Sequence, residues 1–164
     1  MSRSRKLLIV GGLLLVILGM AYGLYYALFD EHQTLESITL SLARSFSLAA
    51  GKDMAAARTA LDAYAAAKFD YVREVDVHSH WSGLALLLII FGLIFDQVNF
   101  PERMRFLVAA AMVAGSFLFP ASVLLQTFNQ GIVPKALATV AAALLIVSLA
   151  AVAVGFARAK DTQG

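Results

Sequence analysis

The hydrophobic and polar positions of this chain separate into four long apolar runs and one extended polar region. Residues 7–29 are 23 residues without a charge, enough to cross a hydrocarbon core of about 30 Å at about 1.5 Å per helical residue. Residues 106–125 and 136–157 are two further runs of this kind. The pattern predicts an all-α integral membrane protein with transmembrane helices in these segments.

The remaining span is expected from Val77 to Phe95. Only residues 83–95 are wholly apolar, so the helix must take in the polar residues before them in order to cross the membrane. This places His78, His80 and Trp81 at the level of the membrane interface. Four transmembrane helices are therefore expected in all.

Residues 30–76 form the polar region, which still repeats apolar positions at helical spacing. Gly51 is suited to end a first helix and Asp53 to cap a second. Such an αα-hairpin is too small to bury its own core, so it is expected to pack on the membrane surface, on another copy or on a partner protein. Its apolar positions are Leu35, Ile38, Leu42, Phe46 and Ala49 in the first helix and Met54, Ala57, Leu61 and Tyr64 in the second.

The chain is accordingly divided into four parts. Residues 1–29 are predicted to be a cytoplasmic N-terminus and an uncleaved signal-anchor helix, because basic residues precede an apolar run that is too long for a signal-peptide core. Residues 30–76 are the predicted extracytoplasmic hairpin between spans 1 and 2. Residues 77–157 hold spans 2–4, and residues 158–164 are the predicted cytoplasmic tail.

Lysine and arginine predict the orientation. Three precede the first span, two lie between spans 2 and 3, and two follow span 4, whereas the opposing short loop has only Lys135. The hairpin adds basic residues on the opposing side, but it is long and net acidic, so it counts for less. Both termini are expected in the cytoplasm, and the hairpin with all three histidines on the other side.

Composition limits the class of protein. The chain is 60% hydrophobic and only 15% charged, which is outside the range of soluble domains. A formal net charge of +2 gives no reason to expect nucleic-acid binding. There are no cysteines, which excludes disulfides, iron–sulfur clusters, Cys-ligated zinc and covalently attached haem. The expected partners are the lipid bilayer and either other membrane subunits or further copies of the chain.

Several residues of the spans bear on packing. Gly12, Gly19 and Gly23 share one face of the first span and would let a neighbouring helix approach closely, although glycine is also common in membrane helices generally. Pro120 is expected to kink the third span. The residues suited to anchor the spans at the membrane interface are Tyr25, Tyr26 and Trp81.

The segment before Trp81 carries the candidate chemistry, because His78 and His80 alternate with Glu74 and Asp76. In an extended conformation these four side chains would line one face and could hold zinc, copper, iron or manganese. In a helix the two histidines would point about 200° apart, and each could pair with the carboxylate four residues earlier.

A third arrangement combines two spans. His32 follows the first span and is expected at the depth of His78 and His80, so that imidazoles from two helices could hold a b-type haem or copper. The alternative is a structural role, since histidine is also an ordinary residue at membrane interfaces. The candidate metal ligands are His32, Glu74, Asp76, His78 and His80.

The segment from Val77 to Trp81, followed by Gly83 and a leucine-rich helix, resembles small, largely uncharacterised four-span bacterial inner-membrane proteins with an H-x-H motif at a helix entrance. This resemblance implies a bacterial inner membrane. The spacing is also similar to the haem-bearing helix of haem–copper oxidases, in which the two histidines serve different haems. The chain lacks the other histidine-bearing helices of the oxidases, so this second resemblance implies only metal or haem ligation by His78 and His80.

Three functions are consistent with these residues. The first is an accessory subunit of a larger membrane complex, with or without histidine ligands to a haem or metal. The second is a stand-alone b-haem or copper redox protein of the membrane. The third is a membrane sensor whose hairpin receives the signal. No nucleophile with its base and no phosphate-binding loop is present in the sequence, so an autonomous enzyme is not expected.

Overall fold

The computed structural model describes residues 1–158, and all of the regular structure in this range is helical, as the sequence predicts. The last six residues, including Lys160 of the predicted tail, lie outside the described residues. The elements are α1 (Arg3–Phe29), α2 (Glu31–Ala50), α3 (Met54–Ile94), the 3-10 helix η1 (Phe95–Gln97), α4 (Glu102–Phe128) and α5 (Ile132–Ala157).

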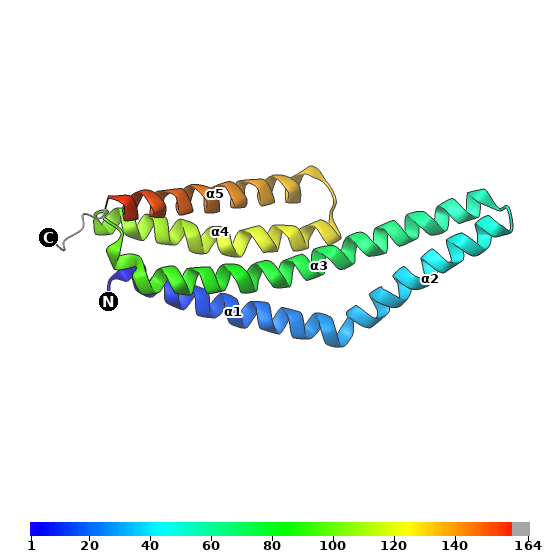
Figure 1. Cartoon of the computed structure of the whole chain (residues 1–164), viewed down its shortest axis with the longest axis horizontal. Helices are drawn as coiled ribbons and strands as arrows, with labels where there is room; N and C mark the ends of the chain where they lie inside the picture. Colours follow the sequence, from blue (N-terminus) through cyan, green and yellow to red (C-terminus); the bar gives the residue numbers. More distant parts are fainter. Residues whose placement is uncertain (159–164) are drawn as a thin grey trace.

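Four of these helices, α1, α3, α4 and α5, are long and apolar enough to cross a membrane. They lie side by side, with the start of α1 and the end of α5 near the same end of the group (Figure 1). The second helix of the expected hairpin and the second expected span form one uninterrupted helix, α3, so the boundary expected between residues 76 and 77 falls inside it. The structure therefore contains one helix where two segments were expected.

The helix α3 presents a continuous seam to α1 and α2. The seam residues are separated alternately by three and four positions, the spacing that keeps one face of a helix against a neighbour over a long distance. All of them are buried or partly buried. They are Ala57, Ala60, Tyr64, Ala67, Tyr71, Glu74, His78, Trp81, Ala85, Leu88, Gly92 and Phe95.

The facing seam is divided between α1 and α2. In α1, Leu8, Gly12, Leu15 and Gly19 follow the same spacing and are buried. A Cβ added at Gly12 would lie 2.7 Å from Ile89 Cγ1 and 2.9 Å from the carbonyl oxygen of Ala85, so only glycine fits at this contact. α1 ends at Phe29 and α2 begins at Glu31, with Asp30 between the two helices. The close contacts of α1 with α3 are those that the glycine face of the first span would permit.

The remaining helices complete one side of the group. α4 packs against α1 and α3, and α5 packs on α4, where a Cβ at Gly115 would overlap Leu145 at 2.8 Å. α4 runs through Pro120 as a single helix. The far end of α5 is tied back by Asn99, whose side chain donates a hydrogen bond to the carbonyl oxygen of Arg158 at 2.7 Å.

A two-helix arm projects beyond this group (Figure 1). The arm consists of residues 31–70, which are α2 together with the part of α3 that packs on it. Asp53 caps α3 as expected, because its side chain accepts a hydrogen bond from the backbone N–H of Ala56 at 3.1 Å. The two helices are therefore joined by a tight turn at the tip of the arm.

The turn has its unusual backbone conformation at Lys52 and not at Gly51. Gly51 has a φ of −76°, which any residue adopts, whereas Lys52 has a φ of 64°, in the left-handed region. Hydrogen bonds from the backbone N–H groups of Lys52 to Ala49 and of Asp53 to Leu48, each 3.0 Å, hold it there. A side chain at Lys52 therefore costs about 1 kcal/mol that glycine would avoid.

Substitutions at Lys52 and Gly51 should show which of the two positions needs the left-handed backbone conformation. Lys52→Gly is expected to raise the free energy of unfolding of the arm by about 1 kcal/mol. Gly51→Ala should not lower it, because the new Cβ would meet only carbonyl oxygens at 3.5 and 3.6 Å. Thermal unfolding of the purified protein followed by circular dichroism would test this. A loss of stability in Lys52→Gly would contradict the assignment.

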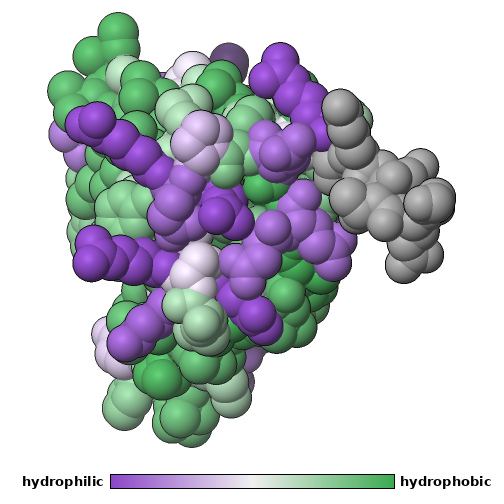
Figure 2. Space-filling view, turned by 90° about the vertical axis from the view of Figure 1, so that its left-hand side faces the viewer, coloured by the Kyte–Doolittle hydropathy of each residue, from purple (hydrophilic) through white to green (hydrophobic). Residues whose placement is uncertain are grey.

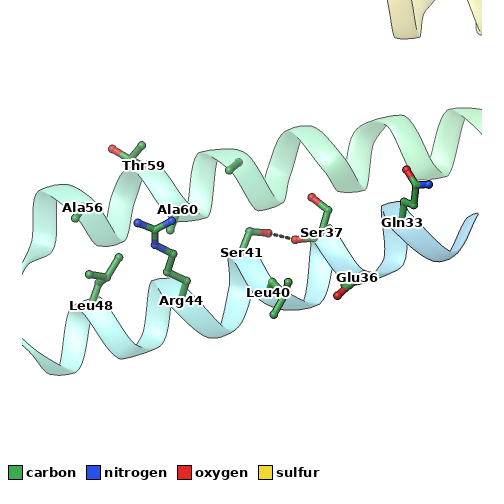
Figure 3. A pocket seen from close by; sticks show the side chains of 11 residues that line it. Gln33, Glu36, Ser37, Leu40, Ser41, Arg44, Leu48, Ala56, Thr59 and Ala60 are labelled. Carbon is green, nitrogen blue, oxygen red and sulfur yellow. Dashed lines mark hydrogen bonds between the residues drawn. The ribbon is translucent and has the colours of Figure 1, made fainter. Parts of the chain in front are cut away.

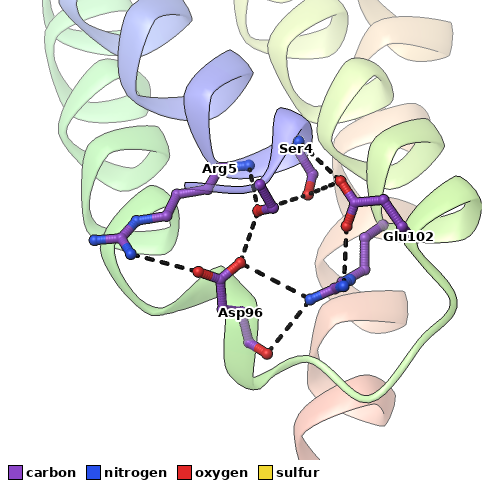
Figure 4. Close-up of polar contacts among 6 residues, drawn as sticks. Ser4, Arg5, Asp96 and Glu102 are labelled. Atoms are coloured by element: carbon purple, nitrogen blue, oxygen red, sulfur yellow. Dashed lines mark hydrogen bonds and ion pairs between the residues drawn. The ribbon is translucent and has the colours of Figure 1, made fainter.

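Polar side chains gather at the end of the molecule where α1 starts and α5 ends (Figure 2). There the hydroxyl of Ser2 donates to Asp96 at 2.7 Å, and Arg5 and Arg105 form ion pairs with the same carboxylate at 3.4 and 3.8 Å (Figure 4). Arg105 also pairs with Glu102 at 2.9 Å. The network joins the start of α1, η1 and the start of α4.

Asp96 is the centre of this network. The hydrogen bond from Ser2, aided by Arg5 and Arg105, holds the pKa of the Asp96 carboxyl below its ordinary value. A carboxyl whose pKa is lower in the folded state stabilises the fold above its unfolded pKa, and this contribution is lost as the pH falls through the folded pKa.

Asp96→Asn is therefore expected to lower the stability at neutral pH, by less than about 1 kcal/mol because the site is exposed. The difference between Asp96→Asn and the unaltered protein should disappear in acid, below the lowered pKa of Asp96. Thermal unfolding of both proteins from neutral to strongly acidic pH measures it. A difference that stayed constant over this range would rule out the ionic role.

Candidate functional site

The segment that carries the two histidines is helical throughout, because residues 74–80 lie within α3. Of the two conformations considered from the sequence, the extended one is therefore excluded. His78 lies on the seam and contacts α1, whereas His80 lies two residues away and its ring packs on Phe119 of α4. The two imidazoles serve different helix contacts, as their 200° separation around the helix requires.

His78 fills the space left by a glycine of α1. Its Nδ1 atom lies 2.8 Å from the carbonyl oxygen of Gly19. A Cβ added at Gly23 would overlap the imidazole ring at Nδ1. Gly19 and Gly23 thus form the α1 side of a small recess that the His78 ring occupies.

His80 is held by its own helix and by α4. Its Nδ1 atom lies 2.6 Å from the backbone oxygen of Asp76, and its ring meets the ring of Phe119 edge-on at 5.0 Å between centroids. The next residue, Trp81, is buried and donates from Nε1 to the carbonyl oxygen of Phe117 at 3.4 Å. The segment therefore links α3 to α1 through His78 and to α4 through His80 and Trp81.

These contacts assign the proton positions of both imidazoles. A backbone carbonyl can only accept a hydrogen bond, so Nδ1 must carry the hydrogen in His78 and in His80. In the neutral form, Nε2 of each ring is then the atom with the free lone pair. The two Nε2 atoms belong to rings on different sides of α3, so they do not form a chelate.

The pairs expected between each histidine and the carboxylate four residues earlier are not formed. In the described part of the chain no hydrogen bond or ion pair joins Glu74 to His78, and His80 uses the backbone of Asp76. The Asp76 carboxylate instead pairs with Arg73 at 3.5 Å. Both imidazoles thus bond to backbone carbonyl oxygens and not to these carboxylates. A sequence pattern does not show such backbone contacts.

His32 does not lie at the depth of the other histidines. Gly19 lies against Trp81 and Gly23 lies against His78, so residues later in α1 contact residues earlier in α3. His32 lies nine residues beyond Gly23, roughly 13 Å further along at 1.5 Å per residue. It is exposed on α2. The shared haem or copper site of two helices is therefore not assembled within one chain.

The candidate ligands do not gather into a metal centre. Within residues 1–158, no group of three or more His, Cys, Asp or Glu side chains is placed to hold an ion. The residues expected to anchor the spans also differ from one another: Tyr25 is exposed, while Tyr26 and Trp81 are buried against neighbouring helices. The ring of Tyr26 lies 6.5 Å from that of Tyr71 of α3. Tyr26 and Trp81 thus serve packing between helices.

The arm has two open grooves that the sequence alone did not indicate. Groove A has a volume of about 690 Å³ and lies between α2 and α3 (Figure 3). Groove B has a volume of about 540 Å³. On α2, Leu40 and Arg44 line groove A, whereas Leu42 and Phe46 line groove B. Residues two positions apart point in nearly opposite directions from a helix, so the grooves lie on opposite sides of the arm. Groove A is lined by residues that include Glu36, Leu40, Arg44, Leu48, Thr59 and Ala60, and groove B by residues that include Leu42, Phe46, Met54, Ala57, Arg58 and Leu61.

The two grooves differ in chemistry. In groove A, the polar side chains of Glu36, Arg44 and Thr59 surround Leu40 and small alanines. Groove B is mainly apolar, and Phe46 and Met54 in it are 69% and 67% exposed. The apolar positions expected in the hairpin include most of the residues of groove B, and the hairpin was expected to be too small to cover them by itself.

No family model, no curated protein and no solved structure matches the chain.

The recess of His78 can be tested by changing both of its sides. Gly23→Ala is expected to destabilise the protein by about 1–3 kcal/mol, because the new methyl group displaces the imidazole and breaks its hydrogen bond to Gly19. The double variant Gly23→Ala with His78→Ala should recover part of this loss, since the smaller side chain makes room. Thermal unfolding of the four proteins in detergent gives the coupling energy. Additive effects would show that the two residues do not share the recess.

Proposed function

We propose that this chain is an accessory integral-membrane subunit of a larger membrane complex, and that its arm is the part that binds the partner. The observation that carries this proposal is the arm itself, which extends beyond the four apolar helices and leaves a groove on each side open. The apolar helices would hold the chain in a bacterial inner membrane. The arm would place the grooves in the adjacent aqueous compartment.

The distribution of basic residues supports an arm on the extracytoplasmic side. Figure 2 shows hydrophilic side chains gathered at the end of the molecule where α1 starts and α5 ends, and the exposed basic residues there include Arg3, Lys6, Arg103 and Arg158. At the other end of the molecule, Lys135 is the basic residue next to the short connection between α4 and α5. Short loops rich in lysine and arginine stay in the cytoplasm. Both termini would then be cytoplasmic.

Groove A is the better site for a different protein. It combines an apolar floor with two side chains of opposite charge, Glu36 and Arg44. Neither forms an ion pair within residues 1–158. They are eight residues apart on α2, or roughly 12 Å along the helix. A partner helix with an apolar face, and with a basic and an acidic residue at the same separation, would match groove A.

The histidine segment fits this function as a structural element. His78 and His80 connect α3 to α1 and to α4 just below the point at which the arm leaves the group. The hydrogen bond of His78 to Gly19 and the packing of the His80 ring on Phe119 would stiffen the base of the arm and keep its grooves at a defined position. This role requires no bound metal or haem.

A charge placed in groove A should release the partner. Leu40 is 61% exposed, so Leu40→Asp leaves the packing of the arm intact while it introduces a carboxylate into the proposed interface. A loss of about ten-fold or more in affinity is expected, because burying a leucine contributes about 1.5–3 kcal/mol and the charge adds a desolvation cost.

Native electrophoresis of membranes dissolved in mild detergent would measure this. The unaltered chain should migrate in a complex larger than two copies, and Leu40→Asp should lose it. The control Thr39→Asp changes an exposed neighbour outside the groove and should retain the complex. If both variants behaved alike, or if the unaltered chain migrated without other proteins, the proposal would fail.

A further inference from the structure

The end of the molecule where α1 starts and α5 ends presents several exposed cations. Within residues 1–158, this end carries six basic and two acidic residues. Both carboxylates form ion pairs with Arg5 or Arg105, which are partly buried. The other basic side chains of this end are exposed and form no ion pair in the same range: Arg3, Lys6, Arg103 and Arg158. These side chains are thus free to meet a ligand outside the chain.

Three of these cations lie beside exposed apolar side chains. In each case the two residues are four positions apart, so they lie on the same side of the helix. The cation is one turn, or about 5.4 Å, nearer the end of the molecule, and the apolar residue is at least 44% exposed. The pairs are Lys6 with Val10 in α1, Arg103 with Leu107 in α4, and Arg158 with Val154 at the end of α5. We call Lys6, Arg103 and Arg158 the cationic rim.

The opposite ends of α1 and α5 have a different chemistry. α1 is followed by the acidic residues Asp30 and Glu31. Lys135 lies at the start of α5, but the residue one turn further along is the polar Thr139. Residues 30–76, which include the arm, hold eight acidic and five basic residues. Cations beside an exposed apolar surface are therefore a feature of one end of these helices.

The members of the cationic rim point to different sides of the molecule. Residues two positions apart on a helix point in nearly opposite directions. Lys6 is two positions from Ser4, whose hydroxyl is hydrogen-bonded to α4, so Lys6 points away from α4. Arg103 is two positions from Arg105 and points away from the ion pairs of that residue, and Arg158 belongs to a third helix. A compact partner would reach only part of the rim, whereas lipid around the apolar helices would lie beside all of it.

We propose that the cationic rim binds the headgroups of anionic phospholipids. A ligand of one rim pair must place an apolar part against the exposed apolar residue and a negative charge one turn beyond it. A phospholipid with a net negative headgroup has both parts, whereas a free phosphate ion has only the charge. In the orientation proposed above, the rim lies at the cytoplasmic leaflet, whose surface is negative. The proposal goes beyond the accessory role, but it rests on the membrane insertion that this role requires.

Brominated lipids can measure the lipid preference at one position of the rim, because bromine quenches the fluorescence of a tryptophan that it contacts. Leu107→Trp places such a reporter one turn from Arg103, and Leu125→Trp places a matched reporter toward the other end of α4. Both leucines are exposed, at 57% and 46%, so the packing of the helices should be retained. The signal of the buried Trp81 is measured in the unaltered chain and subtracted.

The purified protein is placed in phosphatidylcholine vesicles that contain either brominated phosphatidylglycerol or brominated phosphatidylcholine. At low salt, phosphatidylglycerol should be favoured about five-fold more at Leu107→Trp than at Leu125→Trp, because a basic residue near the surface attracts anionic lipid by about this factor. Adding Arg103→Gln to Leu107→Trp should remove the preference. Adding Lys68→Gln, which removes an exposed cation of the arm, should retain it. Both leaflets have the same lipids, so the direction of insertion does not affect the result.

Equal preference at the two tryptophans, or an unchanged preference after Arg103→Gln, would overturn the proposed lipid site. Sodium phosphate should weaken the preference no more than sodium chloride of equal ionic strength, and a stronger effect of phosphate would replace the lipid with a free anion as the ligand. These outcomes leave the accessory role intact. Absence of quenching by either lipid at both positions would instead contradict membrane insertion, and with it the accessory role.

Discussion

The rest of the structure depends on the packing of α3 along its whole length against α1 and then α2. The contact is close because small residues meet large ones across it: Gly12 lies against Ile89, and Gly92 against Ile9. Close approach of two long helices yields many dispersion contacts and aligns their axes. α3 therefore supports both the apolar helices and the arm, while α4 covers one side of it and α5 packs on α4.

This seam explains the position of the polar residues near the middle of α3. Glu74 and His78 occupy seam positions that elsewhere hold alanine, glycine, leucine or aromatic residues. The imidazole of His78 is accommodated because Gly23 has no side chain and because the carbonyl oxygen of Gly19 accepts its hydrogen bond. A polar group inside a helix interface is stable only with such a partner. The histidine and the glycines are thus parts of one contact, although they are far apart in the sequence.

The arm has two open sides because the seam uses only one stripe of each of its helices. A pair of helices buries the facing stripe and leaves two grooves, and a third and fourth helix are needed to fill them. Groove A carries charges of both signs, which favours a specific partner, whereas groove B is mainly apolar.

The sequence by itself determined the helical class, the four apolar helices and the two-helix unit between the first two of them, because helix formation follows from local apolar runs, caps and spacing. Asp53 and the end of α1 at Phe29 are where the sequence pattern places them. Only the tertiary structure decided which residues meet. The register of α1 on α3 moves His32 away from His78, and backbone carbonyls rather than Glu74 and Asp76 bind the two imidazoles. Such contacts depend on the relative position of two helices to within one turn, and no local pattern specifies that position.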